Sequence, residues 1–246
     1  MKIKLNCDMG ESFGIYSFGL DKEVMPYIDM ANLACGFHAS DPVTMHKSVK
    51  NAKEQGVEIG CHPAYPDLLG FGRREMSCSQ EEIISFVLYQ LGALDAICKS
   101  YGINVSYLKP HGALYNSMMN DEKIFKAIAK AISKYDNSIN LMILSSFKNS
   151  HYETLAKKYN ISLLYEVFAD RAYTDKGFLV PRTEEDAVIS DKNKIIERAK
   201  LLFEQGSIRT INQKELKLKV DTICLHGDNE SALELVKALH QLKNEY

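Results

Sequence analysis

The segment 108–116 reads Leu-Lys-Pro-His-Gly-Ala-Leu-Tyr-Asn, so a cation and an imidazole directly follow an apolar run. Packing alone gives no reason for Lys109 and His111 to stand there, because an unpaired buried charge is costly. Pro110 also excludes Lys109 from a helix surface. The segment is typical of an active site, with Lys109 as an electrophile or anion anchor; the alternative is a buried ion pair between Lys109 and an acid.

Other apolar runs in the chain end in the same way, with titratable side chains. These endings are Leu5-Asn-Cys-Asp8, Leu33-Ala-Cys-Gly-Phe-His38, Ile59-Gly-Cys-His62, Tyr165-Glu-Val-Phe-Ala-Asp-Arg171 and Ile223-Cys-Leu-His-Gly-Asp228. If the runs are parallel strands, their carboxyl ends converge on one rim, which is where βα barrels carry their catalytic groups.

Titratable groups at these strand ends could surround one divalent cation or one polarised carbonyl group. They are Asp8, His38, His62, His111, His226 and Asp228. Their spacing does not choose between the two, and no H-E-x-x-H or H-x-x-x-H pattern puts two imidazoles on one helical face. Each histidine taken singly also fits a structural role.

The elements that must position these residues form a repeated βα pattern. Runs rich in β-branched and apolar residues predict strands near 2–7, 28–35, 57–61, 105–109, 140–145, 162–167 and 220–225. Most are separated by segments of helical period, whose starts are marked by Asp41-Pro42, Ser79 with Glu82, Asp121, Asp191 and Asn229.

Two irregular stretches interrupt the pattern, and both are predicted to be functional loops on the rim that carries the strand ends. The first, 63–77, contains Asp67 and the sequence Gly-Phe-Gly-Arg-Arg74. The second, 166–191, contains Glu166, Asp170 and Arg171. No linker or repeat suggests a domain boundary, so one domain over 1–246 is expected.

Length and composition narrow the class of protein. The 246 residues are 46% hydrophobic and 25% charged, which fits a single-domain α/β barrel. A net charge of −2 with scattered Lys and Arg argues against nucleic acid as a partner. We expect no membrane span and no signal peptide, hence a cytoplasmic location. No two cysteines form a C-x-x-C pair, and four of them are expected in the core: Cys7, Cys35, Cys61 and Cys224.

Sequence motifs for nucleophilic and phosphate chemistry are missing. Gly10, Gly14 and Gly19 form neither of the standard glycine-rich phosphate loops, so a nucleotide is not held by one of them. No G-x-S-x-G elbow is present, and no Cys is placed for a Cys-His pair. Activated water is therefore favoured over covalent catalysis.

Seven blocks of the sequence, taken together, closely resemble the LamB/YcsF family, whose members are A subunits of prokaryotic 5-oxoprolinases. The blocks are Leu-Asn-Cys-Asp-Met-Gly-Glu11, Ala-Asn-Leu-Ala-Cys-Gly-Phe-His38, His-Pro-Ala-Tyr-Pro-Asp67, Gly-Phe-Gly-Arg-Arg74, Lys-Pro-His-Gly-Ala-Leu-Tyr-Asn116, Glu-Val-Phe-Ala-Asp-Arg-Ala-Tyr173 and His-Gly-Asp-Asn229. They span nearly the whole chain in the family's order.

The resemblance implies an irregular seven-stranded βα barrel, TIM-like and related to glycoside hydrolases and polysaccharide deacetylases. It also implies ATP-dependent opening of the lactam of 5-oxoproline to glutamate, with Mg²⁺ bound to ATP, and B and C partner subunits. A protein-bound divalent metal stays an open question.

The catalytic roles are hypotheses. Lys109 and His111 would stabilise negative charge on the carbonyl or phosphoryl oxygens, and Asp8 with His38 or His62 would orient and deprotonate water. For substrate binding we select Glu11, Asn32, His38, Asp67, Arg74, Asn116, Glu166, Asp170, Arg171, His226 and Asp228.

Two alternatives from other classes remain open. One is a metal-dependent, deacetylase-like amidohydrolase that acts alone, with Asp8, His38 and His62 as ligands. The other is a non-catalytic regulatory protein that binds a small ligand in a degenerate barrel. Metal in the purified chain favours the first, and ligand binding without turnover favours the second.

Overall fold

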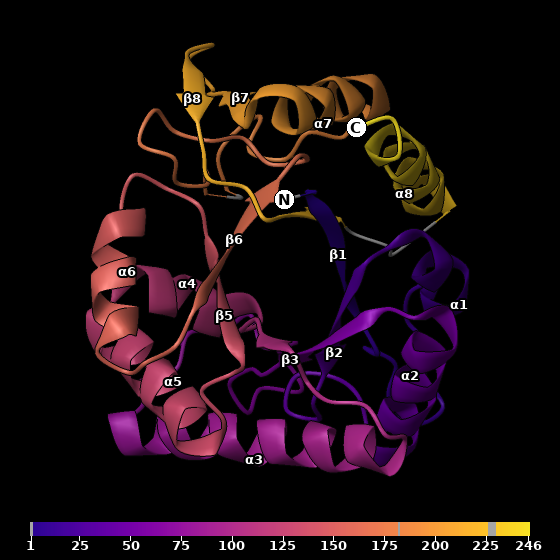
Figure 1. Cartoon of the computed structure of the whole chain (residues 1–246), viewed down its shortest axis with the longest axis vertical. Coiled ribbons are helices and arrows are strands. Elements are labelled where there is room, and N and C mark those ends of the chain that lie inside the picture. Colours follow the sequence, from indigo (N-terminus) through magenta and orange to yellow (C-terminus); the bar gives the residue numbers. More distant parts are fainter. Residues whose placement is uncertain (1, 182, 226–229) are drawn as a thin grey trace.

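The computed structural model of the chain describes residues 2–181, 183–225 and 230–246. Within these residues, seven parallel strands close into a barrel in the order β1-β2-β3-β4-β5-β6-β9 (Figure 1). The strands are β1 Lys4–Met9, β2 Met30–Ala34, β3 Glu58–His62, β4 Tyr107–Leu108, β5 Asn140–Leu144, β6 Leu163–Phe168 and β9 Thr222–Leu225. Each predicted apolar run thus overlaps one barrel strand, and the predicted irregular seven-stranded βα barrel is confirmed.

Helices surround the barrel on its outer side (Figure 1). They are α1 Asp21–Val24 with the 3₁₀ turn η1 Met25–Tyr27, α2 Pro42–Gln55, α3 Gln80–Ser100, α4 Gly112–Asn120, α5 Glu122–Tyr135, α6 Asn149–Lys157, α7 Lys192–Gln205 and α8 Glu230–Lys243. A small antiparallel hairpin, β7 Ser207–Arg209 with β8 Glu215–Lys217, is inserted between α7 and β9. The sequence analysis did not predict this hairpin, α1, α4 or α6.

The helix starts lie where the sequence predicts them. Asp41, Asp121 and Asp191 accept hydrogen bonds from backbone N–H groups of the first turns of α2, α5 and α7. Ser79 and Glu82 form a reciprocal capping box at α3. Each such cap contributes about 1 kcal/mol to helix stability. The predicted start at Asn229 lies outside the described residues.

The two faces of the barrel strands have different chemistry, because successive side chains of a strand point to opposite faces. Residues such as Leu5, Leu33 and Val167 belong to one large apolar core that includes residues of the surrounding helices. The inward face carries a more polar set, for example Asn6 and Asn32, which are fully buried. The barrel interior is therefore built for hydrogen bonding, and the main apolar core lies outside the barrel wall.

Gly60 on β3 makes room for the ring of Tyr107 inside the barrel. A Cβ at this glycine would lie 2.1 Å from the Tyr107 ring. The hydroxyl group of Tyr107 then reaches across to donate to Asn32 Oδ1 at 2.7 Å. A side-chain-free position on one strand thus allows a large polar residue on the next.

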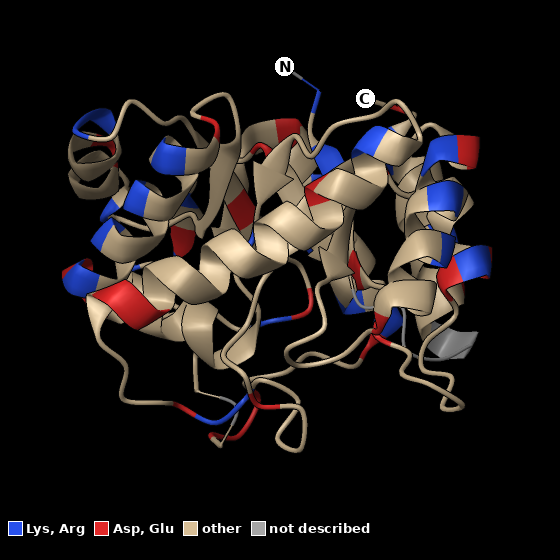
Figure 2. Cartoon of the chain, turned by 90° about the horizontal axis from the view of Figure 1, so that it is seen from below, with Lys and Arg blue, Asp and Glu red and all other residues tan. Residues whose placement is uncertain are grey.

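Helix α3 is, among the described residues, the one helix long and apolar enough to cross a membrane by length and composition. It packs as a core helix of the barrel, with Ile83, Val87, Leu91 and Leu94 buried in the main apolar core. Its outer side carries few charges where it crosses the front of Figure 2, and elsewhere in that view acidic and basic residues are interspersed.

Candidate active site

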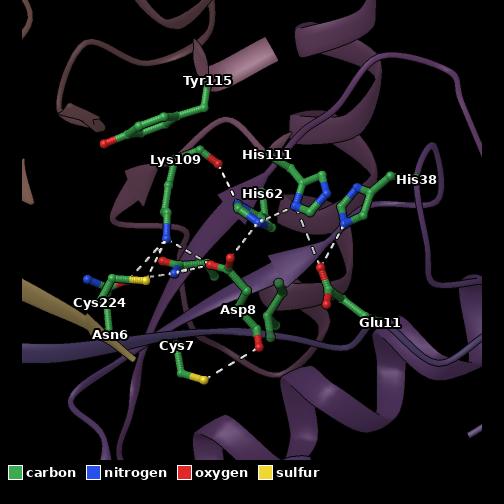
Figure 3. Close-up of polar contacts among 12 residues, drawn as sticks. Asn6, Cys7, Asp8, Glu11, His38, His62, Lys109, His111, Tyr115 and Cys224 are labelled. Carbon is green, nitrogen blue, oxygen red and sulfur yellow. Dashed lines mark hydrogen bonds and ion pairs between the residues drawn. The ribbon is translucent and has the colours of Figure 1, made fainter. Parts of the chain in front are cut away.

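The predicted site residues on the strands come together at the carboxyl ends of the barrel (Figure 3). Asp8 lies on β1, His62 ends β3, Lys109 follows β4 and Glu166 lies on β6. Parallel strands bring these ends to one rim, so the convergence expected from the sequence is confirmed. Seven of the selected residues line a cavity of about 550 Å³: Asp8, Glu11, His62, Lys109, His111, Asn116 and Arg171.

Lys109 is the centre of a buried polar network inside the barrel, near the carboxyl ends of the strands. Its ammonium group lies 2.8 Å from Asp8 Oδ1 and 2.8 Å from Glu166 Oε1. It also donates to Cys224 Sγ at 3.2 Å and to Asn6 Oδ1 at 3.3 Å. With only 3% of its surface exposed, Lys109 forms the buried ion pair that was the alternative interpretation, yet it still borders the cavity.

Buried polar side chains deeper in the barrel hold Asp8 in place. Asn32 donates its amide N–H groups to Asp8 Oδ1 and to Asn6 Oδ1, both at 2.8 Å. Asn32 is in turn held by the Tyr107 hydroxyl group. Asn32 is fully buried and does not border the cavity. It therefore positions Asp8 and does not contact a substrate in the cavity, which differs from the substrate-binding role predicted for it.

The charges of this network are strongly coupled. Burial opposes the ionised form of Asp8, but His62 and Lys109 together hold the pKa of this carboxyl group well below its usual value. Burial likewise opposes the charge on Lys109, but Asp8, Cys224 and Glu166 hold its pKa well above the usual value. Lys109 is therefore a cation and Asp8 an anion at neutral pH, which suits Lys109 to stabilising charge rather than accepting protons.

Tyr115 on α4 makes the second polar contact of the Glu166 carboxylate. Its hydroxyl group donates to Glu166 Oε2 at 2.9 Å, while the other carboxylate oxygen faces Lys109. Burial and the neighbouring Glu166 raise the pKa of Tyr115 well above its usual value, so the phenol stays protonated. Glu166 is completely buried, and its carboxylate balances Lys109 instead of lining the cavity.

A group of three imidazoles and one carboxylate, which we call the histidine cluster, stands beside this network and consists of Glu11, His38, His62 and His111 (Figure 3). One possible ligand atom from each residue lies within 4.8 Å of those of the others. The rings of His38 and His111 are stacked, with centroids 3.8 Å apart. Glu11, His38 and His62 lie at the ends of three different barrel strands, and His111 follows a fourth. Asp8 lies outside the cluster.

Contacts with the backbone fix the two central rings of the cluster. His62 Nδ1 lies 2.7 Å from the carbonyl oxygen of Lys109, and His111 Nε2 lies 2.9 Å from that of Phe71. A carbonyl oxygen only accepts, so these two nitrogens carry the protons. A neutral His111 in this orientation has no N–H to donate into the cavity, which differs from the charge-stabilising role predicted for it.

Burial keeps two rings of the cluster, those of His38 and His111, uncharged. Burial, followed by the neighbouring His62, lowers the pKa of His38 well below its usual value. Burial, followed by His38 and His62, lowers the pKa of His111 to about 2. Both rings are therefore neutral at pH 7 and offer lone pairs, which is the form in which histidine binds a metal ion.

Two glycines allow the 63–79 loop to approach α4 and the cluster. Gly72 has a φ of +62°, and a Cβ there would meet the side chains of His38 and His111 at 2.8 and 2.9 Å. Gly112, which opens α4, has a φ of +52° and lies against the carbonyl group of Gly72. The Gly-Phe-Gly sequence thus places Phe71 and its carbonyl oxygen directly over His111.

Asp67 and Arg74 do not reach the cavity. Arg74 Nε donates to Asp67 Oδ1 at 2.9 Å, and Asp67 also accepts from the backbone of Gly70. This pair fastens the loop, whereas the neighbouring Arg73 lines the cavity with its guanidinium group over the Phe71 ring. The arginine of this loop that lines the cavity is therefore Arg73, and not its neighbour Arg74, which was selected from the sequence.

The remaining selected residues have different positions. Asn116 is exposed on α4 and borders the cavity. Arg171 borders it too, but its guanidinium group donates to the carbonyl oxygens of Val180 and Ala187 and so shapes the loop after β6. Asp170 follows β6 and does not line the cavity. His226 and Asp228 lie outside the described residues.

Sequence reasoning missed several residues of the site. Cys224 was assigned to the core, and Asn6 and Tyr115 were not assigned, although all three contact the Lys109 network. The strand period could have indicated Asn6, which stands two residues before Asp8 on the same face. Nothing in the sequence distinguishes Arg73 from Arg74.

Together, a closed parallel βα barrel and a charged cavity at the carboxyl ends of its strands define a TIM-like barrel with a candidate active site at its mouth. The LamB/YcsF family model matches residues 3–245, so this chain belongs to the LamB/YcsF family.

Named relatives and solved structures agree with this family. The chain is 48% identical over 240 residues to the protein named as the A subunit of 5-oxoprolinase in Vibrio campbellii, covering 98% of this chain and 95% of that protein. It is 47% identical over 245 residues to the protein of the same name from Pyrococcus abyssi, covering 100% and 95%. The crystal structure of a lactam utilization protein from Thermus thermophilus is 38% identical, with a TM-score of 0.93 and coverage of 100% and 97%.

A more distant structure shares the fold alone. It is a putative cellobiose-phosphate cleavage protein from Enterococcus faecalis, with a TM-score of 0.57, 12% identity and coverage of 98% of this chain and 94% of that one.

Proposed function

We propose that this chain is the A subunit of an ATP-dependent 5-oxoprolinase, which hydrolyses 5-oxo-L-proline to L-glutamate while ATP is converted to ADP and phosphate. The observation that carries the proposal is the 47–48% identity over nearly the full length to relatives that bear the name of this 5-oxoprolinase component. The cavity at the barrel mouth, with its buried cation and carboxylates, supports a site for a small polar substrate.

Coupling to ATP follows from the chemistry of the substrate. A lactam is an unreactive amide, and phosphorylation of its oxygen activates the ring carbon for attack by water. The C–N bond of the adduct then breaks, with the nitrogen leaving as the amine, and hydrolysis of the resulting acyl phosphate releases phosphate and glutamate. The described part of this chain has no standard glycine-rich phosphate loop, and Arg73 is the one exposed basic side chain on the cavity wall. These residues do not fit a nucleotide site, so we propose that Mg²⁺-bound ATP is held elsewhere in the complex.

Within the barrel, we assign Asp8 and Lys109 the central roles. Asp8 is ionised, and 23% of its side chain is exposed toward the cavity, so it can orient and deprotonate an attacking water. Lys109 stabilises negative charge that develops on the former carbonyl oxygen. Arg73, an exposed cation on the cavity wall, suits the carboxylate of the substrate.

The need for B and C partner subunits is the part of the proposal that is easiest to test. The chain is purified alone and mixed with the B and C subunits, and glutamate release from 5-oxoproline is measured with and without ATP. We expect turnover in the complete mixture with ATP and little or none when any component is omitted. Full turnover by this chain alone would refute the requirement for partners, and no turnover in any mixture would refute the activity.

A second candidate function is a metal-dependent amidohydrolase that acts alone, and the histidine cluster is the observation that favours it. Such an enzyme would hydrolyse amide substrates without ATP. The same assay separates the two, because ATP-independent release of product by the isolated chain supports only the second.

A further inference from the structure

We infer that Glu11, His38, His62 and His111 form a binding site for one divalent transition-metal ion, with zinc as the best representative. The inference names a cofactor for the cavity described above, and its catalytic relevance, though not the binding itself, rests on the proposed function.

The first argument is a conflict between lone pairs. His62 Nδ1 and His111 Nε2 hold their protons against the backbone carbonyl oxygens of Lys109 and Phe71. When each ring carries a single proton, the opposite nitrogens, His62 Nε2 and His111 Nδ1, present lone pairs, and these two atoms face each other at 3.0 Å. Two acceptors at hydrogen-bond distance repel unless a cation lies between them or beside them.

Neighbouring carboxylates add to the same conflict. Asp8 Oδ2 lies 3.4 Å from His62 Nε2, and Glu11 Oε1 lies 3.6 Å from His111 Nδ1. Both oxygens are acceptors in their ionised form. The region where these atoms converge therefore attracts positive charge, and each central imidazole is already in the tautomer that presents a lone pair to it.

The spacing of the atoms fits a small metal ion. Ligand atoms about 2.1 Å from a tetrahedral zinc ion are about 3.4 Å from one another. In the cluster, the contacts His62 Nε2 to His111 Nδ1, Glu11 Oε1 to His38 Nε2 and Glu11 Oε1 to His111 Nδ1 are 3.0, 3.1 and 3.6 Å. These three distances bracket the tetrahedral value, and the other pairs of ligand atoms lie within 4.8 Å of one another. The stacked rings of His38 and His111 would tilt to direct both lone pairs at one ion.

The donor set and its supports indicate which ions would bind. Three imidazoles and one carboxylate suit Zn²⁺ and similar first-row ions, whereas Mg²⁺ and Ca²⁺ prefer oxygen ligands. Hydrogen bonds from the outer nitrogens of His62 and His111 to carbonyl oxygens are the supporting contacts that metal-binding histidines usually make. His38 Nδ1 is buried without a hydrogen-bond partner, so His38 is the least constrained of the three rings.

The test is zinc binding by the full chain, in the absence of substrate, ATP and partner subunits. Chelator-treated protein is titrated with ZnCl₂ by calorimetry, and the bound metal is measured by mass spectrometry after desalting. Cobalt is then used as a second probe, because a tetrahedral site with nitrogen ligands gives an intense visible absorption band. We expect one zinc ion per chain and the tetrahedral cobalt spectrum.

Three variants locate the site. Glu11→Gln keeps the shape of the side chain and removes its charge, and His111→Ala removes a central ligand; each should weaken zinc binding by about 100-fold or more, since even the loss of a supporting contact costs 10-fold to 100-fold. His151→Ala is the matched control, because His151 lies on α6, is half exposed and pairs with Glu122 outside the cluster. Its zinc affinity should equal that of the unmodified chain.

Circular dichroism of the metal-free variants establishes that they are folded, and Glu11→Gln remains informative if His111→Ala is not. Absence of zinc binding in the unmodified chain, or equal binding in Glu11→Gln and the control, would overturn the inference and leave a shared proton as the cation between the two rings. Either result leaves the glutamate-release assay, and with it the proposed function, unaffected.

Discussion

At the scale of single residues, the site is a balance of buried charges around Lys109. Asp8 and Glu166 both lie 2.8 Å from its ammonium group, and Glu166 is completely buried. Removing one partner from such a group leaves an uncompensated buried charge, which is costlier than the pair itself is favourable. Function and stability are therefore linked at Lys109.

Replacing Lys109 should reduce both activity and stability. Lys109→Met leaves Asp8 and Glu166 facing each other without a cation, and we expect a loss of about 3–5 kcal/mol in the free energy of unfolding, measured by urea denaturation. In the reconstituted complex, loss of one charge-stabilising donor should lower turnover by about 100-fold or more.

The double variant Lys109→Met with Glu166→Gln separates these two effects. It removes one of the stranded carboxylates, so part of the lost stability should return, while turnover stays low because the cation is still missing. A double variant no more stable than Lys109→Met would show that Glu166 is not charged in the native protein.

The neutral histidines predict a loss of stability in mild acid. The pKa of His111 is about 2 in the folded chain, and that of His38 is also well below its usual value. The unfolded chain binds protons at these rings near pH 6.5, so the stabilising difference is fully present above about pH 6.5 and is lost progressively as the pH falls toward 2.

This pH dependence is measured by urea unfolding of the metal-free chain between pH 7 and pH 5. The free energy of unfolding should fall by up to about 1.4 kcal/mol per pH unit for each ring below pH 6. The slope should be smaller in His111→Asn, which has no group that titrates in this range. Equal slopes in the two proteins would contradict a neutral, buried His111.

At the scale of elements, the barrel could be predicted from the sequence because each strand is an apolar run. In the barrel each of these strands pairs in parallel with a strand on either side. Every predicted run overlaps a strand, although β4 is reduced to Tyr107–Leu108 because Pro110 soon ends the extended segment. The short helices α4 and α6 escaped prediction, since nine residues give too few turns for a clear apolar period. The strands β7 and β8 pair only with each other and form a sheet separate from the barrel.

Position in the βα pattern alone correctly places Asp8, His62 and Lys109 at the cavity, while their catalytic roles stay predictions. Prediction of the site was less successful in the loops, where the pattern gives no information. Arg74 binds Asp67 and Arg73 faces the cavity, and only the three-dimensional course of the 63–79 loop separates these neighbours. The buried partner of Lys109 on β6, Glu166, was selected as a substrate contact because its strand face was not considered.

A glycine on β3 is predicted to be essential for the barrel interior. In Gly60→Ala, the added methyl group would overlap the Tyr107 ring, which also holds Asn32 beneath Asp8. Overpacking of this kind costs about 1–3 kcal/mol in the free energy of unfolding. The matched control is Gly92→Ala on α3, where the nearest atom, on Tyr135, is 4.0 Å away.

Gly92→Ala should stabilise the chain by about 0.5–1 kcal/mol, because alanine loses less conformational freedom than glycine in a helix. Thermal and urea unfolding of both variants give the comparison. A Gly60→Ala chain as stable as the Gly92→Ala chain would mean that the ring of Tyr107 does not occupy the barrel interior.

At the scale of the whole molecule, the barrel provides a closed frame that brings groups far apart in the sequence to one rim. Asp8 and Lys109 are 101 residues apart and share a hydrogen bond. The loops after β3 and β6 complete the cavity wall with Phe71, Arg73 and Val180. The proposed subunit thus presents its lactam site at one end of the barrel, where partner subunits can supply activated phosphate.

The most direct test of the account is turnover by the reconstituted complex with Asp8→Asn in place of the unmodified chain. Asparagine keeps the shape of Asp8 and its contact with Asn32 but removes the charge that orients and deprotonates water. We predict that ATP-dependent glutamate release falls at least about tenfold, as expected for loss of a general base, while 5-oxoproline binding is largely retained. Normal turnover with Asp8→Asn would contradict the assignment of the lactam chemistry to this barrel mouth.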